Sequence, residues 1–362
     1  MKIFIIGSFP PPYNGQNIGT KLMKDLLSEQ FEVEMFRWNL SWYLTDSGSL
    51  FDKIKYYTVA LLKYAIIFIR TWSKFVLKQP DALYIVPSSN IKGILRDFIL
   101  YLPYLISNRR IFCQIRSGSF IINTKLLKFI YGRKNFRFLF LTPYLSQISN
   151  TPRDQKIVIP NLVDPTFDLY QPNLKSNNSD TIKIVFLSNL FASKGVLNII
   201  EAVKKCKYSK NYRLYIYGKG ESAIVERITK SIKNYENIIY NGEVSDRKQV
   251  KLIYSGSDIF ALPTVYSVEA SPRSIIEAMS QSCVPLVTNH AGIPDMVNSQ
   301  CSYIIDKNRD ITRQLIDNLD LIYLNRADLK LKQTLARERY ETQFGRKQIQ
   351  GNILEFFSSS IN

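Results

Sequence analysis

Histidine and cysteine, the residues that most often hold metals or form cross-links, are scarce in this chain. Its 362 residues include one histidine and four cysteines. The cysteines lie far apart, without the spacing of a zinc site or a disulfide framework: Cys113, Cys206, Cys283 and Cys301. Cys113 and Cys283 have apolar neighbours and are expected to be small core residues. The scarcity excludes a disulfide-rich secreted domain and fits a reducing cytoplasm.

Long apolar runs are missing as well. A membrane-spanning helix needs about 20 largely apolar residues, and charges interrupt the apolar stretches of this chain before that length is reached. The apolar start, Met1–Gly7, is too short for a secretory signal and leads directly into a proline-rich loop. We therefore expect a cytoplasmic protein whose only membrane contact would be peripheral, at the inner face of the cytoplasmic membrane.

Acidic residues are the minority, and the formal net charge is +18. Residues 1–170 hold 22 Lys and Arg against 11 Asp and Glu, a difference of +11, and residues 171–362 hold 26 against 19, a difference of +7. The excess favours anionic or phosphate-bearing partners without naming one, since nucleic acid, anionic lipid and a nucleotide diphosphate all fit it.

Apolar runs typical of buried parallel strands recur along the chain and alternate with helical patterns. We expect strands at 2–6, 31–36, 82–86, 110–115 and 138–141, and again at 183–187, 213–217, 237–240, 258–262 and 284–287. The alternation stops near 161–180 and then restarts. It predicts an α/β protein with two doubly wound domains, at 1–165 and 166–340.

The segment 53–78 permits two interpretations. Its basic residues recur at intervals of seven, four and four on one helix face: Lys63, Arg70, Lys74 and Lys78. One interpretation is an interfacial helix on an anionic membrane, at about 1 kcal/mol per basic residue. The other is an ordinary amphipathic helix with its apolar face in the core of the first domain. The apolar stretch 98–106 raises the same question.

Two carboxylates, Glu269 and Glu277, lie eight positions apart between two expected strands. The sequence predicts a loop that runs into a helix, with backbone amides near Arg273 and Ser274 unpaired at the helix N-terminus, where anions bind. Each carboxylate accepts hydrogen bonds from hydroxyls. Two carboxylates that accept hydrogen bonds from hydroxyls, on either side of an anion site, indicate a site for a nucleotide sugar.

This segment resembles the acidic signature of the retaining glycosyltransferases of the GT-B fold, in particular family four. Four further segments resemble motifs of that family and occur in the family's order. They are the loop 10–15, the segment 186–195, the strand 258–264 before the signature and the turn 292–295 after it. The resemblance implies two Rossmann-like domains facing across a cleft, an acceptor-binding one first and a nucleotide-sugar-binding one second. It also implies a closing helix, 341–362, that crosses back to the first domain.

The resemblance further implies a hexosyltransferase that retains configuration and moves a sugar from a nucleotide diphosphate to a hydroxyl. The acceptor is expected to be a saccharide or lipid-linked saccharide in bacterial surface polysaccharide synthesis, such as O-antigen or capsule. No Asp-x-Asp pair is present to hold a divalent metal, so neither metal nor other cofactor is expected. The implied donor-binding residues are Gly15, Gln16, Asn189, Lys194, Ser271, Pro272, Arg273, Ser274 and Glu277.

The chain departs from the family pattern at three positions. Many relatives have a first-domain histidine at the sugar, whereas the single histidine here, His290, is expected in a loop of the second domain. Arg116 or Ser117 is expected to replace it. Asn189 stands where an arginine is usual, and Gln16 where a second glycine is common. We predict Glu269, Lys194 and Arg116 as the catalytic residues.

Two other classes of function stay open. One is a non-catalytic GT-B protein that binds a nucleotide sugar or serves as a scaffold, which the missing histidine and arginine favour. The other is a nucleic-acid binder, which only the charge favours, since no zinc pattern, RNP-type motif or Arg-rich tail is present. We expect no nucleic-acid partner.

Overall fold

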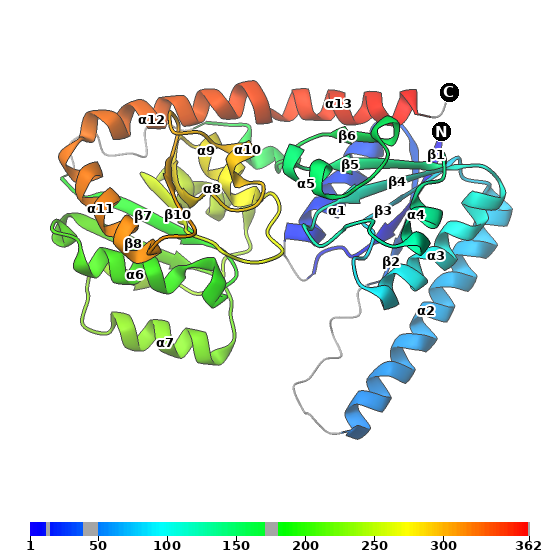
Figure 1. Cartoon of the computed structure of the whole chain (residues 1–362), viewed down its shortest axis with the longest axis horizontal. Helices are drawn as coiled ribbons and strands as arrows, with labels where there is room; N and C mark the ends of the chain where they lie inside the picture. The colour runs from blue at the N-terminus through cyan, green and yellow to red at the C-terminus, as the bar shows by residue number, and fades with distance from the viewer. Residues whose placement is uncertain (12–14, 39–49, 171–179, 361–362) are drawn as a thin grey trace. The chain divides into compact units, whose positions relative to one another are not determined.

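The computed structural model describes residues 1–11, 15–38, 50–170 and 180–360, with the backbone alone at 50–57. The chain forms two compact units (Figure 1). The first consists of Met1–Leu162 together with Gln350–Asn362, and the second of Val163–Ile349.

The first unit is built on a six-stranded parallel sheet in the order β2-β1-β3-β4-β5-β6. The strands are β1 (Lys2–Gly7), β2 (Glu32–Arg37), β3 (Ala82–Ile85), β4 (Arg110–Ile115), β5 (Phe136–Phe140) and β6 (Lys156–Val158). The helices are α1 (Gly15–Leu27), α2 (Leu50–Lys78), α3 (Ile91–Ile106), α4 (Lys125–Tyr131) and α5 (Pro143–Ile148). Side chains of β1, β3, β4 and β5 are almost entirely buried, as in a parallel sheet covered on both faces.

The second unit repeats this architecture, with the strand order β12-β11-β10-β7-β8-β9. Its strands are β7 (Ile182–Leu187), β8 (Tyr212–Tyr217), β9 (Ile238–Tyr240), β10 (Ile259–Leu262), β11 (Val284–Thr288) and β12 (Tyr303–Ile305). Its helices are α6 (Val196–Lys205), α7 (Ser222–Ile232), α8 (Arg247–Ser255), α9 (Arg273–Ser280), α10 (Ile293–Met296), α11 (Ile311–Leu324) and α12 (Arg326–Arg339). Both sheets confirm the predicted doubly wound α/β class, and β6 and β12 add a strand to each.

The chain leaves the second unit later than the sequence predicted. Val163 and Phe167 are buried in the core of the second unit, so that unit begins before residue 166. Tyr340 and Phe344, in a π-helical turn, are buried in the same core. The predicted limits 1–165, 166–340 and 341–362 are therefore displaced by the residues that fill this core.

Helix α13 (Arg346–Ser359) brings the end of the chain to the first sheet. The ring of Phe357 stacks on that of Phe112 in β4 with 4.0 Å between centroids. The Arg110 Nε atom donates to the carbonyl of Ser360 at 2.7 Å. These contacts explain why the residues from Gln350 onward belong to the first unit, although they follow the second in sequence.

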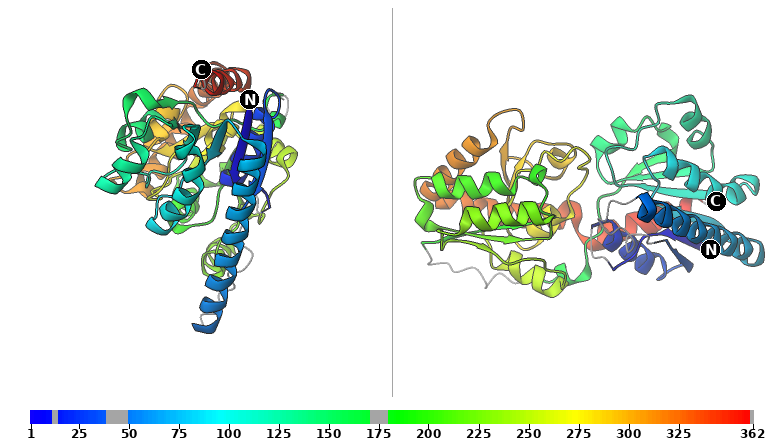
Figure 2. Two further views of the ribbon diagram at one scale, coloured as in Figure 1. Left: turned by 90° about the vertical axis from the view of Figure 1, so that its right-hand side faces the viewer. Right: turned by 90° about the horizontal axis from the view of Figure 1, so that it is seen from below.

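The long helix α2 runs past the edge of the first sheet (Figure 2). Its inward contacts are ionic as well as apolar: Lys74 and Lys78 both pair with Glu34 of β2, and Phe75 meets Tyr104 edge to face. The basic residues predicted to face a membrane thus include two that face the sheet. No helix in the described part of the chain is long and apolar enough to cross a bilayer.

Candidate functional site

Each sheet has one point at which the strand order reverses, so that the loops leaving the adjacent strands diverge. In the second sheet this point lies between β7 and β10, and in the first between β1 and β3. Open parallel sheets bind ligands outside the carboxyl ends of their strands at such a point. Topology alone therefore selects the loops after β7 and β10 in the second unit and the loops after β1 and β3 in the first.

A glycine brings the two loops of the second unit together. The loop after β7 ends in a 3₁₀ turn, Ala192–Lys194, followed by Gly195 at φ +82°. A Cβ at this position would lie 2.4 Å from the carbonyl oxygen of Pro263, so the approach requires glycine. The amide of Val265 then donates to the carbonyl of Ser193 at 2.7 Å.

This contact places Lys194 beside Glu269. The Lys194 Nζ atom lies 2.5 Å from the Glu269 Oε2 atom and 4.6 Å from the centre of the Tyr266 ring. Thr264 donates to the same carboxylate oxygen at 3.3 Å. Both charged residues are 8% exposed, so the lysine is held by a carboxylate and an aromatic face rather than solvated as a surface residue.

The second predicted carboxylate, Glu277, is 4% exposed in α9 and pairs with Arg247 at the start of α8. The guanidinium of Arg247 also lies 4.9 Å from the centre of the Phe167 ring. Burial, and then the charge of Glu277, raise the pKa of Tyr254 well above its ordinary value of 10.0, which keeps this phenol neutral. Arg247 was not predicted, since nothing in the sequence relates it to a helix 30 residues later.

The residues between the two carboxylates form the start of α9. Pro272 occupies the cap position, Arg273 and Ser274 are the first two helical residues, and both are partly exposed. Ser271 is buried, and its hydroxyl contacts the sulfur of Met296 at 3.5 Å. Asn189, in the loop after β7, is exposed. The helix N-terminus predicted as an anion site is therefore present, flanked by the two paired carboxylates.

His290 lies in the loop between β11 and α10, as predicted. Its Nε2 atom is 2.8 Å from the carbonyl oxygen of Tyr266, and its Nδ1 atom is 3.5 Å from the Lys307 Nζ atom. Through Tyr266 it supports the loop that carries Glu269.

In the first unit, Arg116 links the loop after β4 to the start of α1. Its guanidinium donates to the carbonyl of Gln16 at 2.6 Å and to the hydroxyl of Tyr84 at 3.0 Å. It also bonds Gln114 and Thr20. Gly15 and Gln16 are the first two residues of α1 rather than part of a turn, and a Cβ on Gly15 would meet nothing within 4 Å.

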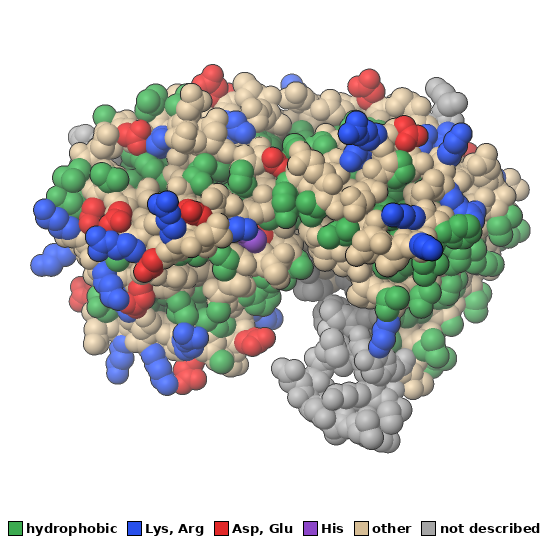
Figure 3. Space-filling view, viewed as in Figure 1, with side chains coloured by type: hydrophobic (Ala, Val, Ile, Leu, Met, Phe, Trp, Pro, Cys, Tyr) green, Lys and Arg blue, Asp and Glu red, His purple; other side chains and the backbone are tan. Residues whose placement is uncertain are grey.

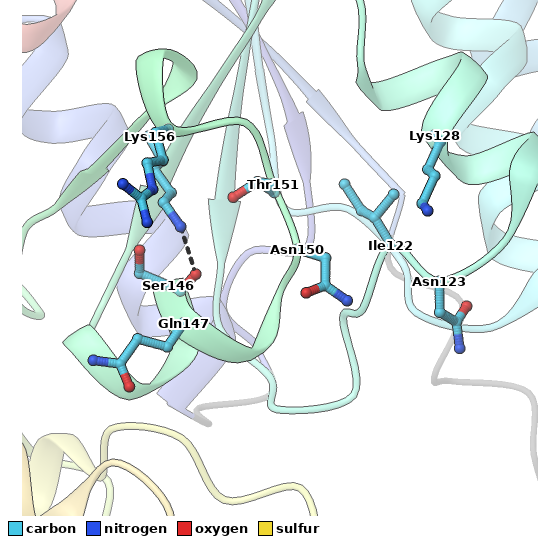
Figure 4. Close-up of a pocket in the computed structure, with 9 residues that line it drawn as sticks. Ile122, Asn123, Lys128, Ser146, Gln147, Asn150, Thr151 and Lys156 are labelled. Carbon is cyan, nitrogen blue, oxygen red and sulfur yellow. Dashed lines mark hydrogen bonds between the residues drawn. The ribbon is translucent and has the colours of Figure 1, made fainter.

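The first unit also has a polar pocket of about 900 Å³. Three cationic and several amide or hydroxyl side chains line it: Lys128, Arg153, Lys156, Asn123, Asn150, Gln147, Ser146 and Thr151, together with Ile122. Figure 4 shows Lys128 and Lys156 on opposite sides of the group, with the Lys156 Nζ atom bonded to the carbonyl of Ser146 at 2.8 Å. No acidic side chain lines this pocket, so it suits a polar or anionic ligand.

Among the described residues, no group of three or more His, Cys, Asp and Glu side chains is arranged to hold a metal ion. All four cysteines are buried and unpaired with one another, as predicted for Cys113 and Cys283. The cations and the helix N-terminus of the second unit are the groups on hand to neutralise an anionic ligand there.

The family model described as glycosyl transferases group 1 matches residues 171–340. The gpi3 subunit of phosphatidylinositol N-acetylglucosaminyltransferase from Schizosaccharomyces pombe is 23% identical over 241 residues, 63% of this chain and 49% of that protein. WcaL of Escherichia coli K12, whose name assigns it to colanic acid biosynthesis as a glycosyltransferase, is 26% identical over 208 residues, 55% of this chain and 50% of that protein. The chain thus spans about half the length of these curated relatives.

The crystal structure of Anabaena Alr3699/HepE in complex with UDP aligns with a TM-score of 0.71 at 14% identity, covering 99% of this chain and 100% of that one. The same protein in complex with UDP-glucose aligns with a TM-score of 0.70. At this identity the likeness establishes the fold, which is the GT-B arrangement of two doubly wound sheets.

Proposed function

Because residues 171–340 belong to the family of group 1 glycosyl transferases, we propose that this protein transfers a sugar from a nucleotide diphosphate to a hydroxyl of a saccharide during synthesis of a bacterial surface polysaccharide. The observation that carries the proposal is the pairing at the switch point of the second sheet. There Lys194 meets Glu269, and Glu277 meets Arg247, on either side of the N-terminus of α9.

The donor would lie with its diphosphate at that N-terminus. Lys194 and Arg273 would supply positive charge, and the first amides of α9 would supply hydrogen bonds to the phosphate oxygens. Glu277 would accept hydrogen bonds from the ribose hydroxyls, and Glu269 from hydroxyls of the sugar. UDP and UDP-glucose are bound by Alr3699/HepE, which supports a uridine nucleotide among the donors to be tested first.

The reaction we propose breaks the bond between the anomeric carbon and the leaving phosphate oxygen through an oxocarbenium-like state. The acceptor hydroxyl oxygen forms its bond to that carbon from the same face, so configuration is retained. The hydroxyl proton passes to an oxygen of the departing phosphate. Lys194 and the α9 amides stabilise the negative charge of this group as it leaves, without a metal.

Arg116 would act in the first unit by fixing the start of α1. Its guanidinium is bonded to Gln16, Tyr84, Gln114 and Thr20, so its contribution to transfer would be to hold the backbone of Gly15 and Gln16 in place. The open space beside Gly15 is consistent with close approach of a ligand. Ser117, bonded to Ser119 at 2.6 Å, would be available to a sugar hydroxyl.

The acceptor would be a lipid-linked saccharide at the inner face of the cytoplasmic membrane. The pocket around Lys128, Arg153 and Lys156 supports an acceptor that is polar and anionic, since it offers three cations and no carboxylate. A saccharide attached to lipid through a phosphate or diphosphate has that chemistry. WcaL, named for colanic acid biosynthesis, supports a surface polysaccharide as the product.

Transfer is tested with purified protein and a panel of nucleotide sugars, with product analysis by mass spectrometry and NMR. We expect turnover of at least one donor in the presence of a chelator, with the anomeric configuration kept. Glu277→Gln should lower donor affinity about 10- to 100-fold, because a charged hydrogen-bond acceptor contributes about 1.5–3 kcal/mol.

The matched control is Glu226→Gln, which changes an exposed glutamate of the same unit and should leave kinetics unchanged. Donor binding without turnover would instead establish the non-catalytic alternative. An inverted product, or complete loss of activity with the chelator, would contradict the retaining or the metal-independent part of the proposal.

A further inference from the structure

The outward face of α2 is apolar, the reverse of an ordinary surface helix. In its described part, residues 58–78, six aliphatic side chains are more than half exposed: Leu61, Leu62, Ile66, Ile69, Val76 and Leu77. Trp72 is 39% exposed within the same series. Their spacing of three and four residues places most of them along one face of the helix.

Helix α3 continues this surface. Ile91, Leu95, Ile99 and Ile106 are exposed along it, and it packs against α2, where Arg96 bonds the hydroxyl of Tyr64 at 3.4 Å. Figure 3 shows hydrophobic side chains gathered over the region of α2 and α3. We call the exposed apolar residues of these two helices the apolar face. Contiguous apolar surfaces of this kind mark sites of association with a protein or membrane.

The inward contacts of α2 fix which side is presented. Lys74 and Lys78 pair with Glu34 of β2, Phe75 packs on Tyr104, and Thr71 is 2% exposed. Because these residues hold the opposite side of the helix against the sheet and α3, rotation of α2 to bury the apolar face would break both ion pairs. The face is therefore presented by the fold.

The charge around the apolar face is almost entirely positive. Residues 50–153, counted from the first residue of α2, contain 17 Lys and Arg against three acidic residues, Asp52, Asp81 and Asp97. Asp97 is fully buried and paired with Arg96, and Asp81 accepts a bond from the Lys2 amide. Exposed cations on α2, α3 and α4 include Arg70, Lys92, Lys125 and Lys128.

We propose that the apolar face docks on an anionic lipid bilayer, with α2 lying in the interface and its aliphatic side chains inserted among the acyl chains. Apolar area on one side of a helix with an excess of cations beside it is the composition that binds such surfaces. The contact is made by the apolar side chains, with the cations around them meeting lipid headgroups, and it depends on neither donor nor acceptor.

A second copy of this chain is the less favoured occupant. Two copies that met through the apolar face would bring two sets of cations together with few acidic residues to compensate them, whereas anionic lipid headgroups neutralise these cations. Self-association is thus an alternative outcome that the test distinguishes.

The test is flotation of the full-length protein with vesicles of phosphatidylglycerol and phosphatidylethanolamine, with phosphatidylcholine vesicles for comparison. We expect binding to the anionic vesicles and at least tenfold weaker binding by Leu62→Gln/Ile66→Gln/Ile69→Gln. Removal of two cations, Arg70→Gln/Lys125→Gln, should weaken binding about fivefold per cation. The emission of Trp72 should shift to the blue on binding, a shift that Trp72→Phe removes.

The matched control is Leu321→Gln/Leu324→Gln/Leu331→Gln, which changes three equally exposed leucines of the second unit and should bind like wild type. Thermal unfolding checks that all variants are folded. Equal flotation of the wild type and the α2 triple variant would overturn the proposal, as would equal binding to neutral vesicles. A wild-type dimer that the triple variant converts to a monomer, without vesicle binding, would assign the face to a second copy. Transfer to a soluble acceptor is measured in parallel, so failure of docking and failure of transfer are separate results.

Discussion

The two units share an architecture but differ in where their unusual chemistry lies. Both are six-stranded parallel sheets with one switch point. In the second unit the exceptional groups are few and local. They are two buried or nearly buried ion pairs: Lys194 with Glu269 in the loops after β7 and β10, and Arg247 with Glu277 between α8 and α9. In the first unit the exceptional feature is a surface, the apolar face of α2 and α3.

The two sheets also differ in strand order. Numbered from β7, the second sheet has the order 3-2-1-4-5-6 of dinucleotide-binding domains, and the first sheet begins 2-1-3-4-5 as in flavodoxin-like domains. Both orders create a ligand site at the switch point. In the second unit the loops there bring Lys194 to Glu269, and in the first the loop after β3 is bonded through Ser88 to the buried pair of Arg96 and Asp97.

The largest effect is expected from Lys194→Met, which removes the cation at the proposed donor site and keeps the length of the side chain. Transfer should fall at least about 100-fold, the usual result of removing one group that stabilises a leaving charge. Glu269→Gln in the same chain should add little, since the two groups act as a pair. Initial rates at saturating donor measure both effects.

The control for this prediction is Lys330→Met, at an exposed lysine of α12 in the same unit, which should leave the rate unchanged. A wild-type rate in Lys194→Met would remove the second unit from the chemistry. Alanine is the poorer choice, because it would leave a cavity beside a buried carboxylate as well as an unpaired charge.

A smaller effect is expected from Lys128→Gln/Arg153→Gln in the pocket of the first unit. If this pocket binds an anionic acceptor, the KM of the double variant for the acceptor should rise about tenfold. The reason is that two exposed charge contacts are lost, each contributing up to about 1 kcal/mol. KM for donor should stay constant. Steady-state kinetics with each substrate varied in turn measure this division, and a change in donor KM alone would contradict it.

Much of the fold could be predicted from the sequence because most strands are continuous apolar runs. β4 has the predicted limits, and nine further predicted strands lie within two residues of the observed ones. β6 and β12, which are edge strands of three residues with partly exposed side chains, were missed.

The site could be predicted from the sequence only where its residues are close together in the chain. Glu269 and Glu277 share one loop and helix, whereas Arg247 lies 30 residues from its partner in an unremarkable charged stretch. The orientation of α2 could not be predicted, for the same reason. Glu34, which binds Lys74 from 40 residues away, decides which face of the helix is turned outward, and a helical pattern by itself contains no such information.

The smallest effect is expected from Glu34→Gln, which tests that account of α2. Burial raises the pKa of Glu34, but its hydrogen bonds to Lys74 and Lys78 outweigh burial and hold the pKa below the ordinary 4.5. A lowered folded pKa means that the ionised carboxylate stabilises the fold above pH 4.5, and that this stabilisation is lost as pH falls through the lowered pKa. Glu34→Gln should therefore lower the free energy of unfolding by about 1 kcal/mol at pH 7, and the difference from wild type should shrink in acid.

Urea unfolding followed by tryptophan fluorescence measures this difference, since all three tryptophans fall within Met1–Leu162. Glu355→Gln, at an exposed glutamate of α13, is the control. A difference that persists unchanged at low pH would mean that packing, rather than the two ion pairs, holds α2 with its apolar face outward.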